Sequence, residues 1–267
     1  MQKFERDYAQ LVQKILKQGE KRQTRNGETT SLFGTMLKVP MNGDMTFPLL
    51  QGRRTYPKGV LGELAAMLRK PTCLADFEKW GCNYWKLWAK EDGSINVDYG
   101  NAWHADGQIE RLKDSLANNP TDRRMIINGW RPANLDNLDL PCCHLLYQFY
   151  VRDGKFLDMI WYQRSVDTMI GLPSDIIFAA AWLISIANEF NLVPGEITMM
   201  LGDCHIYKEH YEAAKVYIDN VVYEPIATPP TYRLTAKTGK DFCTFEPNDI
   251  LLNVYQTHSK LNLELKA

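Results

Sequence analysis

The residues best suited to chemistry lie close together in the middle of the chain: Cys143 beside His144, Arg164 beside Ser165, and then Asp175. A cysteine thiolate is a nucleophile, arginine and a hydroxyl group bind anions, and a carboxyl group pairs with the polar edge of a ring. Together these groups could attack and hold an anionic ring substrate.

The pair Cys143-His144 is weak evidence for catalysis when it is taken alone, because most buried thiols are structural. Side chains that are neighbours on a strand also point to opposite faces, so His144 need not be the base for Cys143.

Two pairs of residues contain arginine: Arg123-Arg124 and Arg164-Ser165. They suit a solvated charged surface or, alternatively, a phosphate site built from bidentate guanidinium groups and a hydroxyl group. The sequence pattern alone leaves both interpretations open.

Hydrophobic spacing predicts the elements that must position these groups. We predict helices over residues 4–19, 61–68, 109–116, 175–192 and 207–218, and strands over residues 31–39, 125–127, 144–151, 156–162 and 197–201. Residues 21–30 are polar and contain Asn26-Gly27, so they are expected to form a loop or a hairpin turn. The pattern indicates one α+β domain over residues 1–267, with a central mixed, twisted sheet flanked by helices.

Composition limits the class of partner and the compartment. The chain has 267 residues and a formal net charge of -1, so no nucleic-acid polymer is expected as a partner. Its six cysteines show no CxxC spacing, which favours free thiols in a reducing cytoplasm, and we predict no metal site. The apolar run 176–186 is too short to span a bilayer and the start of the chain lacks a signal sequence, so we expect a soluble protein without a membrane partner.

Several motifs occur in an order and spacing that resemble the thymidylate synthase family, over nearly the whole chain. They are Cys143-His144 followed by Gln148-Phe149-Tyr150, Asp122-Arg123-Arg124, Gln163-Arg164-Ser165-x-Asp167, and Gly202-Asp203-Cys204-His205-Ile206-Tyr207. Cys142 occupies the position of a proline in the family motif, so Cys143 is assigned as the nucleophile and Cys142 as a packing residue.

The resemblance implies a role for each matching residue. Glu63 matches the general acid/base, whose pKa should be raised on an apolar helix, and Tyr99 lies in a motif near the nucleophile. With Cys143, His144 and Asp175, these two are the expected catalytic residues. The remaining roles are phosphate binding for Arg25, Arg123, Arg124, Arg164 and Ser165, sugar binding for His205 and Tyr207, base binding for Gln163 and Asp175, and cofactor binding for Trp85, Trp88, Asp167 and Ala267. Arg25 also matches an arginine that helps to close the C-terminus over the cofactor.

The same resemblance implies a cofactor and an assembly. The expected cofactor is 5,10-methylenetetrahydrofolate, and the expected assembly is an obligate homodimer packed sheet to sheet. In the family the first arginine pair, here Arg123-Arg124, reaches across the dimer into the phosphate site of the partner.

One residue departs from the family pattern in an informative way. Thymidylate synthases read Gly-Leu-Pro-Phe-Asn where this chain reads Gly171-Leu172-Pro173-Ser174-Asp175. The family asparagine pairs with the uracil edge, whereas an ionised carboxylate only accepts and suits the 4-amino group of cytosine. Members of the family specific for deoxycytidylate carry aspartate here. Asp175 could instead be the N-cap of the helix that follows it.

We therefore expect a phage-type deoxycytidylate hydroxymethylase that converts dCMP to 5-hydroxymethyl-dCMP, located in the cytoplasm of an infected bacterium. The small, polar end of the chain, Glu264-Leu265-Lys266-Ala267, favours hydroxymethylation, because a lid of this kind should exclude water poorly. The alternatives are a dCMP methyltransferase, a thymidylate synthase acting on dUMP, and a regulator that binds nucleotide or RNA without catalysis.

Overall fold

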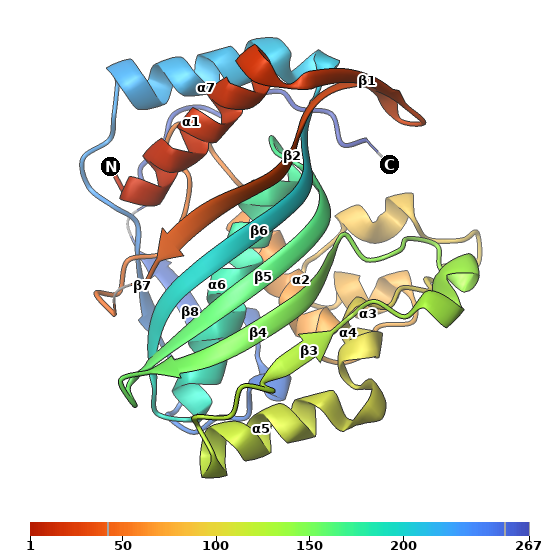
Figure 1. Ribbon diagram of the computed structural model, residues 1–267, viewed down its shortest axis with the longest axis vertical. Coiled ribbons are helices and arrows are strands. Elements are labelled where there is room, and N and C mark those ends of the chain that lie inside the picture. Colours follow the sequence, from red (N-terminus) through yellow and green to blue (C-terminus); the bar gives the residue numbers. More distant parts are fainter. Residues whose placement is uncertain (42, 254, 267) are drawn as a thin grey trace.

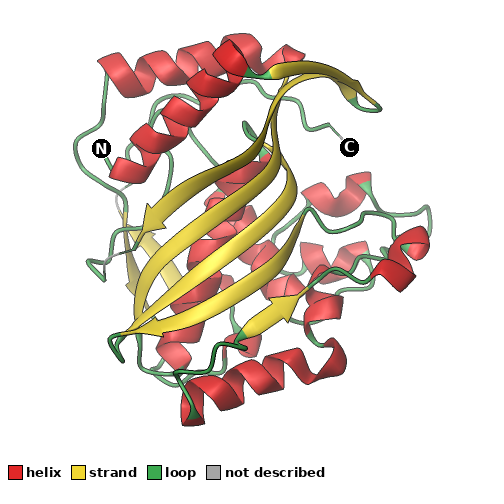
Figure 2. Cartoon of the chain, in the orientation of Figure 1, coloured by secondary structure: helices red, strands yellow, loops and turns green. Residues whose placement is uncertain are grey.

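A six-stranded mixed sheet forms the centre of the protein in the computed structural model, which describes residues 1–267 except Asn42, Val254 and Ala267 (Figures 1 and 2). The strand order is β1-β2-β6-β5-β4-β3. The strands are β1 (Glu20–Thr24), β2 (Gly27–Pro40), β3 (Ile126–Asn128), β4 (His144–Arg152), β5 (Phe156–Asp167) and β6 (Val193–Tyr207). Only the β5–β6 pair of this sheet is parallel, so the described part of the chain confirms the predicted α+β class and the mixed central sheet.

The helices cover one face and the ends of this sheet (Figure 1). They are α1 (Lys3–Gln18), α2 (Pro57–Met67), α3 (Leu74–Glu78), α4 (Tyr99–Trp103), α5 (Gln108–Asn118), α6 (Gly171–Glu189) and α7 (Tyr211–Tyr223). Helices α6 and α2 lie behind the sheet in Figure 1, and β7 (Thr231–Leu234) pairs with β8 (Ile250–Asn253) beside them. The face of the sheet turned to the viewer has no helix across its middle.

Helix α6 is the core helix of the molecule. By length and composition alone it could cross a membrane, but 72% of its apolar window is buried inside the protein. Trp182 of α6 stacks on Trp103 with ring centroids 4.4 Å apart, and aromatic side chains of β4 and β5 pack against it. The nearly all-round apolar composition therefore reflects burial between the sheet and the outer helices.

Helix α6 also begins earlier than predicted, at Gly171 rather than at residue 175. Proline is compatible with the first turn of a helix, so Pro173 does not delay the start. The interpretation of Asp175 as the N-cap is therefore wrong. Ile170 is the residue at the N-cap, and no described side chain caps the helix there. Asp167 Oδ1 instead stabilises the turn just before the helix, where it accepts from the N–H groups of Met169 and Ile170 at 2.8 and 3.2 Å.

Other boundaries differ because tertiary pairing extends the strands. The polar segment 21–30 forms the β1–β2 hairpin, in which Thr24 pairs with Gly27, so the hairpin alternative is correct. Strands β5 and β6 continue to Asp167 and Tyr207, beyond their predicted ends at residues 162 and 201. Helix α7 starts at Tyr211, after a 3₁₀ turn over Lys208–His210, and not at residue 207.

The unit β5–α6–β6 explains why the candidate site lies at one edge of the sheet. Because β5 and β6 are parallel, their carboxyl ends meet at the same edge, with Asp167 opposite His205. Strand β4 is antiparallel to β5, so its first residue, His144, lies opposite Gln163 at that edge. The connection from β5 enters α6 there, which brings Asp175 to the same place.

Candidate active site

A cleft of about 720 Å³ opens at this edge of the sheet. It is bounded by the ends of β4, β5 and β6, by α2, by the 3₁₀ turn Tyr84–Leu87 (η1) and by the β1–β2 hairpin. Of the predicted site residues that the structure describes, all but Arg123 and Arg124 line the cleft. The lining residues are Arg25, Glu63, Trp85, Trp88, Tyr99, Cys143, His144, Gln163, Arg164, Ser165, Asp167, Asp175, His205 and Tyr207. Residues from distant parts of the sequence therefore share one cavity, and their individual roles stay predictions.

Cys143 directly precedes β4, and both its backbone N–H and its backbone carbonyl form hydrogen bonds. Its N–H donates to the hydroxyl oxygen of Tyr99 at 2.9 Å, and its carbonyl accepts from the backbone N–H of Arg164 at 2.8 Å. The Arg164 guanidinium donates through Nε to the Cys142 carbonyl at 2.8 Å and through a terminal nitrogen to the Pro141 carbonyl at 2.9 Å. The position of the thiol is thus fixed by β5.

Burial and charge act on the Cys143 thiol in opposite directions. Burial raises its pKa above the ordinary value, while the nearby cations of Arg164 and Arg25 lower it. Cys142 differs, because its sulfur accepts from the Tyr99 backbone N–H at 3.0 Å and burial raises its pKa to about 12. Of the two adjacent thiols, only Cys143 lines the cleft.

Glu63 projects from α2 into an apolar part of the cleft. The Tyr84 hydroxyl donates to its Oε2 at 2.6 Å, and the Trp85 indole N–H donates to its Oε1 at 2.7 Å. Burial raises the pKa of Glu63 to about 7, and the two hydrogen bonds hold it below the value that burial alone would give. A carboxyl group in this condition can both take up and release a proton near neutral pH.

Asp175 receives its main contact from β5. Gln163 donates from Nε2 to Asp175 Oδ2 at 2.6 Å, and the Trp161 indole N–H donates to Gln163 Oε1 at 3.2 Å. The second bond fixes the orientation of the Gln163 amide, so that its nitrogen faces Asp175. Burial raises the pKa of Asp175 to about 8, and the negative charge of Glu63 adds to that rise.

His144 occupies an aromatic pocket beside the cleft. Its ring lies 4.3 Å from that of Trp161 and 4.6 Å from that of Tyr99, and its Nδ1 is 2.6 Å from the Tyr147 hydroxyl. Burial lowers the pKa of His144 to about 3, so the imidazole is neutral at physiological pH. These contacts favour a structural part for His144 over that of a base for Cys143.

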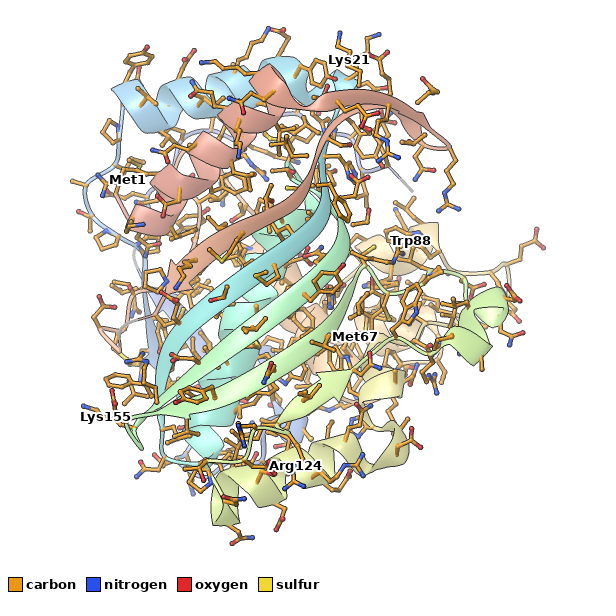
Figure 3. The ribbon with its side chains drawn as sticks, viewed as in Figure 1. Met1, Lys21, Met67, Trp88, Arg124 and Lys155 are labelled. Carbon is orange, nitrogen blue, oxygen red and sulfur yellow. The ribbon has the colours of Figure 1, made fainter. Side chains whose placement is uncertain are left out.

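The predicted phosphate residues divide into two groups. Arg25 at the hairpin turn lines the cleft together with Arg164 and Ser165, and neither arginine has an ion-pair partner among the described residues. Arg123 and Arg124 lie outside the cleft, where Arg124 pairs with Asp122 at 2.9 Å and is exposed. Figure 3 places Arg124 beside α5, well away from Trp88.

The predicted sugar-binding residues lie at the end of β6. His205 Nδ1 is 3.1 Å from Asp203 Oδ1, and the rings of His205 and Tyr207 meet edge to face with centroids 5.2 Å apart. Asp203 also pairs with Arg22 of β1 at 3.2 Å. The carboxylate therefore orients the imidazole and ties the hairpin to β6.

The far wall of the cleft suits a flat, polar ring. Trp85 and Trp88 lie with ring centroids 5.2 Å apart, and Trp85 stacks on Phe77 at 4.9 Å. Asp167 Oδ2 is buried and has no hydrogen-bond partner among the described residues, which leaves an acceptor free for an N–H donor of a ligand. These groups fit the aromatic ring and the N–H groups of a pterin. The predicted contact from Ala267 falls outside the described residues.

Tyr84, which donates to Glu63, is a cleft residue that was not predicted from the sequence. Leu265 and Lys266, which belong to the predicted lid, also line the cleft. Tyr84 stands next to Trp85 in an aromatic run, which was the one available signal.

Comparison with known proteins agrees with this geometry. The family model described as Thymidylate synthase matches residues 6–267. A thymidylate synthase of Corynebacterium aurimucosum is 38% identical over 221 residues, which cover 79% of this chain and 81% of that protein. The chain therefore belongs to the thymidylate synthase family.

Membership of the family establishes the general activity. The protein is a one-carbon transferase acting on C5 of a pyrimidine nucleotide, and 5,10-methylenetetrahydrofolate is the one-carbon donor of the family. Its small-molecule partners are thus a nucleotide and a folate. The base, the product and the assembly are open at this level.

Proposed function

We propose that this transferase acts on dCMP and forms 5-hydroxymethyl-dCMP. The observation that supports dCMP is the buried carboxyl group of Asp175 where the family has an amide. The Trp161 indole N–H donates to the amide oxygen of Gln163, so the amide nitrogen of Gln163 faces residue 175. The side chain of residue 175 must therefore offer an acceptor to that nitrogen. An asparagine would be held in one orientation, with its donor and its acceptor fixed.

A carboxyl group is not restricted in this way, because its proton can sit on either oxygen. Cytosine offers an acceptor at N3 and a donor at its 4-amino group, and a neutral Asp175 answers both. Since burial raises the pKa of Asp175 to about 8, the neutral form predominates at pH 7. Leaving one of these groups mispaired costs about 1–3 kcal/mol.

The residues of the chain divide the chemistry among them. The Cys143 thiolate, held beside the Arg164 cation, adds to C6 of the pyrimidine and makes C5 nucleophilic. Bound 5,10-methylenetetrahydrofolate supplies the one-carbon unit. Glu63 exchanges protons with the ring through water, and Asp175 holds the base edge. Arg25, Arg164 and Ser165 bind the phosphate group from one subunit.

The tail supports hydroxymethylation over methylation. Leu265 and Lys266 border the cleft, and the Lys266 ammonium pairs with Glu264 and Glu209 at 3.0 and 3.6 Å. A charged, hydrated group at the mouth of the site favours the entry of water. Water adding to the one-carbon unit gives the hydroxymethyl product, whereas its reduction gives 5-methyl-dCMP and dihydrofolate.

A second candidate is a thymidylate synthase acting on dUMP. It is favoured by the 38% identity with a thymidylate synthase. A neutral Asp175 can also accept from N3–H of uracil and donate to O4. A binding protein without catalysis is disfavoured, because the nucleophile and the arginines are present and Cys143, Arg25 and Arg164 share the cleft.

The exposed face of the sheet supports a homodimer. Met36, Met200 and Tyr162 are direct neighbours across β2, β6 and β5, and their exposed fractions are 55%, 38% and 37%. Phe33 on the same sheet is 83% exposed. A second copy packed on this face would bury the apolar row and could supply Arg123 and Arg124 to the opposite phosphate site.

Mass spectrometry of the products tests the proposal. The protein is incubated with 5,10-methylenetetrahydrofolate and either dCMP or dUMP, while absorbance follows dihydrofolate. We expect dCMP to gain a hydroxymethyl group without dihydrofolate formation. A methyl gain on dCMP with dihydrofolate would refute the product, and turnover of dUMP alone would refute the substrate.

A further inference from the structure

Tyr84 contacts the candidate acid/base Glu63. Its hydroxyl donates to Glu63 Oε2 at 2.6 Å, and the adjacent Trp85 donates to Oε1 at 2.7 Å. Each oxygen of the carboxylate therefore has its own donor, and both donors come from the single 3₁₀ turn Tyr84–Leu87. Two bonds to the two oxygens fix the plane of the carboxyl group as well as its position.

The approach of α2 to this turn depends on a glycine. A Cβ atom at Gly62 would lie 2.3 Å from the Trp80 carbonyl oxygen, so only glycine allows the helix to pack this closely against the segment before η1. Glu63 is the next residue, and the close packing brings its carboxyl group within reach of Tyr84. Trp85 is fixed in turn by its stacking on Phe77 at 4.9 Å.

We propose that Tyr84 is a positioning residue for Glu63, which holds the carboxylate in its charged form and orients it toward the substrate ring. The inference rests on the acid–base role proposed for Glu63. Tyr84 itself stays protonated, because burial raises its pKa well above the ordinary value. It therefore remains a hydrogen-bond donor throughout the working pH range.

The surroundings of Glu63 make this donor important. The titratable groups close to it are the Cys82 thiol and the Tyr84 phenol, both from the segment at the start of η1, and the Asp175 carboxyl group from α6. Among the described residues, no lysine, arginine or histidine forms an ion pair with Glu63. Its negative charge is thus stabilised by the two neutral donors, Tyr84 and Trp85, against the cost of burial.

The test is the pH profile of kcat/KM for wild type, Tyr84→Phe, Glu63→Gln and the double variant, with dCMP and dUMP each as substrate. One limb of the pH profile should report the ionisation of Glu63 and should therefore be missing in Glu63→Gln. In Tyr84→Phe we expect this limb to lie about one pH unit higher, because the lost hydrogen bond stabilises the charged carboxylate of Glu63. In the Glu63→Gln background, Tyr84→Phe should change kcat/KM less than about twofold. A matched control is Tyr223→Phe, whose ring is 77% exposed at the end of α7.

Three outcomes separate the possibilities. An unmoved limb in Tyr84→Phe, with thermal unfolding and nucleotide binding as in wild type, would overturn the role of Tyr84 alone. An equal loss of rate in both backgrounds would also overturn it, because Tyr84 would then not act through Glu63. A wild-type profile from which Glu63→Gln removes no limb would refute the acid–base role of Glu63 itself. The base specificity is read separately from the two substrates.

Discussion

Among the carboxyl groups that line the cleft, those of Glu63 and Asp175 differ in their hydrogen-bond donors and therefore in their pKa values. Glu63 receives two donors and has a pKa raised to about 7, whereas Asp175 receives one donor and has a pKa raised to about 8. Burial is the main cause of both shifts, and the charge of Glu63 makes ionisation of Asp175 less favourable. At neutral pH Asp175 is therefore mostly protonated, and Glu63 is close to half ionised.

This difference predicts how dCMP binding depends on pH. Because the pKa of Asp175 is raised to about 8, its carboxyl group is neutral below that pH and charged above it. The charged form still accepts from the 4-amino group but faces the lone pair of N3. We expect the Kd for dCMP to rise about tenfold between pH 7 and pH 9, measured by calorimetry. A Kd that stays flat over this range would contradict the neutral form of Asp175 as the binding form.

Most candidate residues could be found from the sequence, because each sits in a short motif at a fixed spacing. Cys143, Arg164 and Asp175 are of this kind. The contact between Tyr84 and Glu63 could not be found, since it joins two elements whose separation depends on the missing side chain of Gly62. The protonation of Asp175 was also beyond the sequence, because it depends on burial and on Gln163.

At the scale of elements, the tail is the part that we propose selects the product. It is anchored along its length: the Tyr255 hydroxyl donates to the Leu50 carbonyl at 2.6 Å, and the His258 N–H donates to the Gln51 carbonyl at 2.8 Å. Nearer the end, His210 Nε2 bonds the Glu264 carbonyl at 3.0 Å. Leu265 and Lys266 are thus held where they line the cleft, and we propose that their polarity controls the entry of water.

A change of polarity at the tail should change the product. We expect Lys266→Ala combined with Ala267→Ile to lower the ratio of hydroxymethyl to methyl product on dCMP by about tenfold, because an apolar tail excludes water better. Mass spectrometry gives the ratio, with dihydrofolate absorbance as a second readout. Lys260→Ala, which changes an exposed residue earlier in the tail, serves as the control. An unchanged ratio in the double variant would mean that the tail does not select the product.

Elements were predicted better than their ends. The periodicity of α1, α2 and α5 located these helices, because each has a clear apolar stripe or run. The boundaries of α6 and β6 were missed. The Asp167 carboxyl group stabilises the turn that leads into α6, and the length of β6 is set by its pairing with β2 and β5. Neither contact is visible in a local pattern.

At the scale of the whole molecule, one chain brings only part of the predicted phosphate site together. Arg25, Arg164 and Ser165 line the cleft, but Arg123 and Arg124 do not. The proposed homodimer would resolve this, because the apolar row Met36, Met200 and Tyr162 offers a face for a second copy. In this proposal the dimer completes the phosphate site and also buries the apolar row.

Mixed dimers test whether the arginines act across the interface. We combine a Cys143→Ala subunit with a subunit carrying Arg123→Ala and Arg124→Ala, each nearly inactive by itself. Random pairing should restore about one quarter of wild-type activity, since half of the dimers are mixed and each has one intact site. Affinity tags on the two subunits identify the mixed dimers. No recovery in purified mixed dimers would show that each subunit uses its own arginines.

The central claim is that Asp175 directs one-carbon transfer to cytosine, and one comparison tests it most directly. The ratio of kcat/KM for dCMP to that for dUMP is measured in wild type and in Asp175→Asn, with thermal unfolding as the check on folding. We expect wild type to prefer dCMP and the variant to shift the ratio toward dUMP by about ten- to a hundredfold, because the amide held by Gln163 has a fixed donor and acceptor. A wild type that prefers dUMP, or a ratio unchanged by the substitution, would contradict the account.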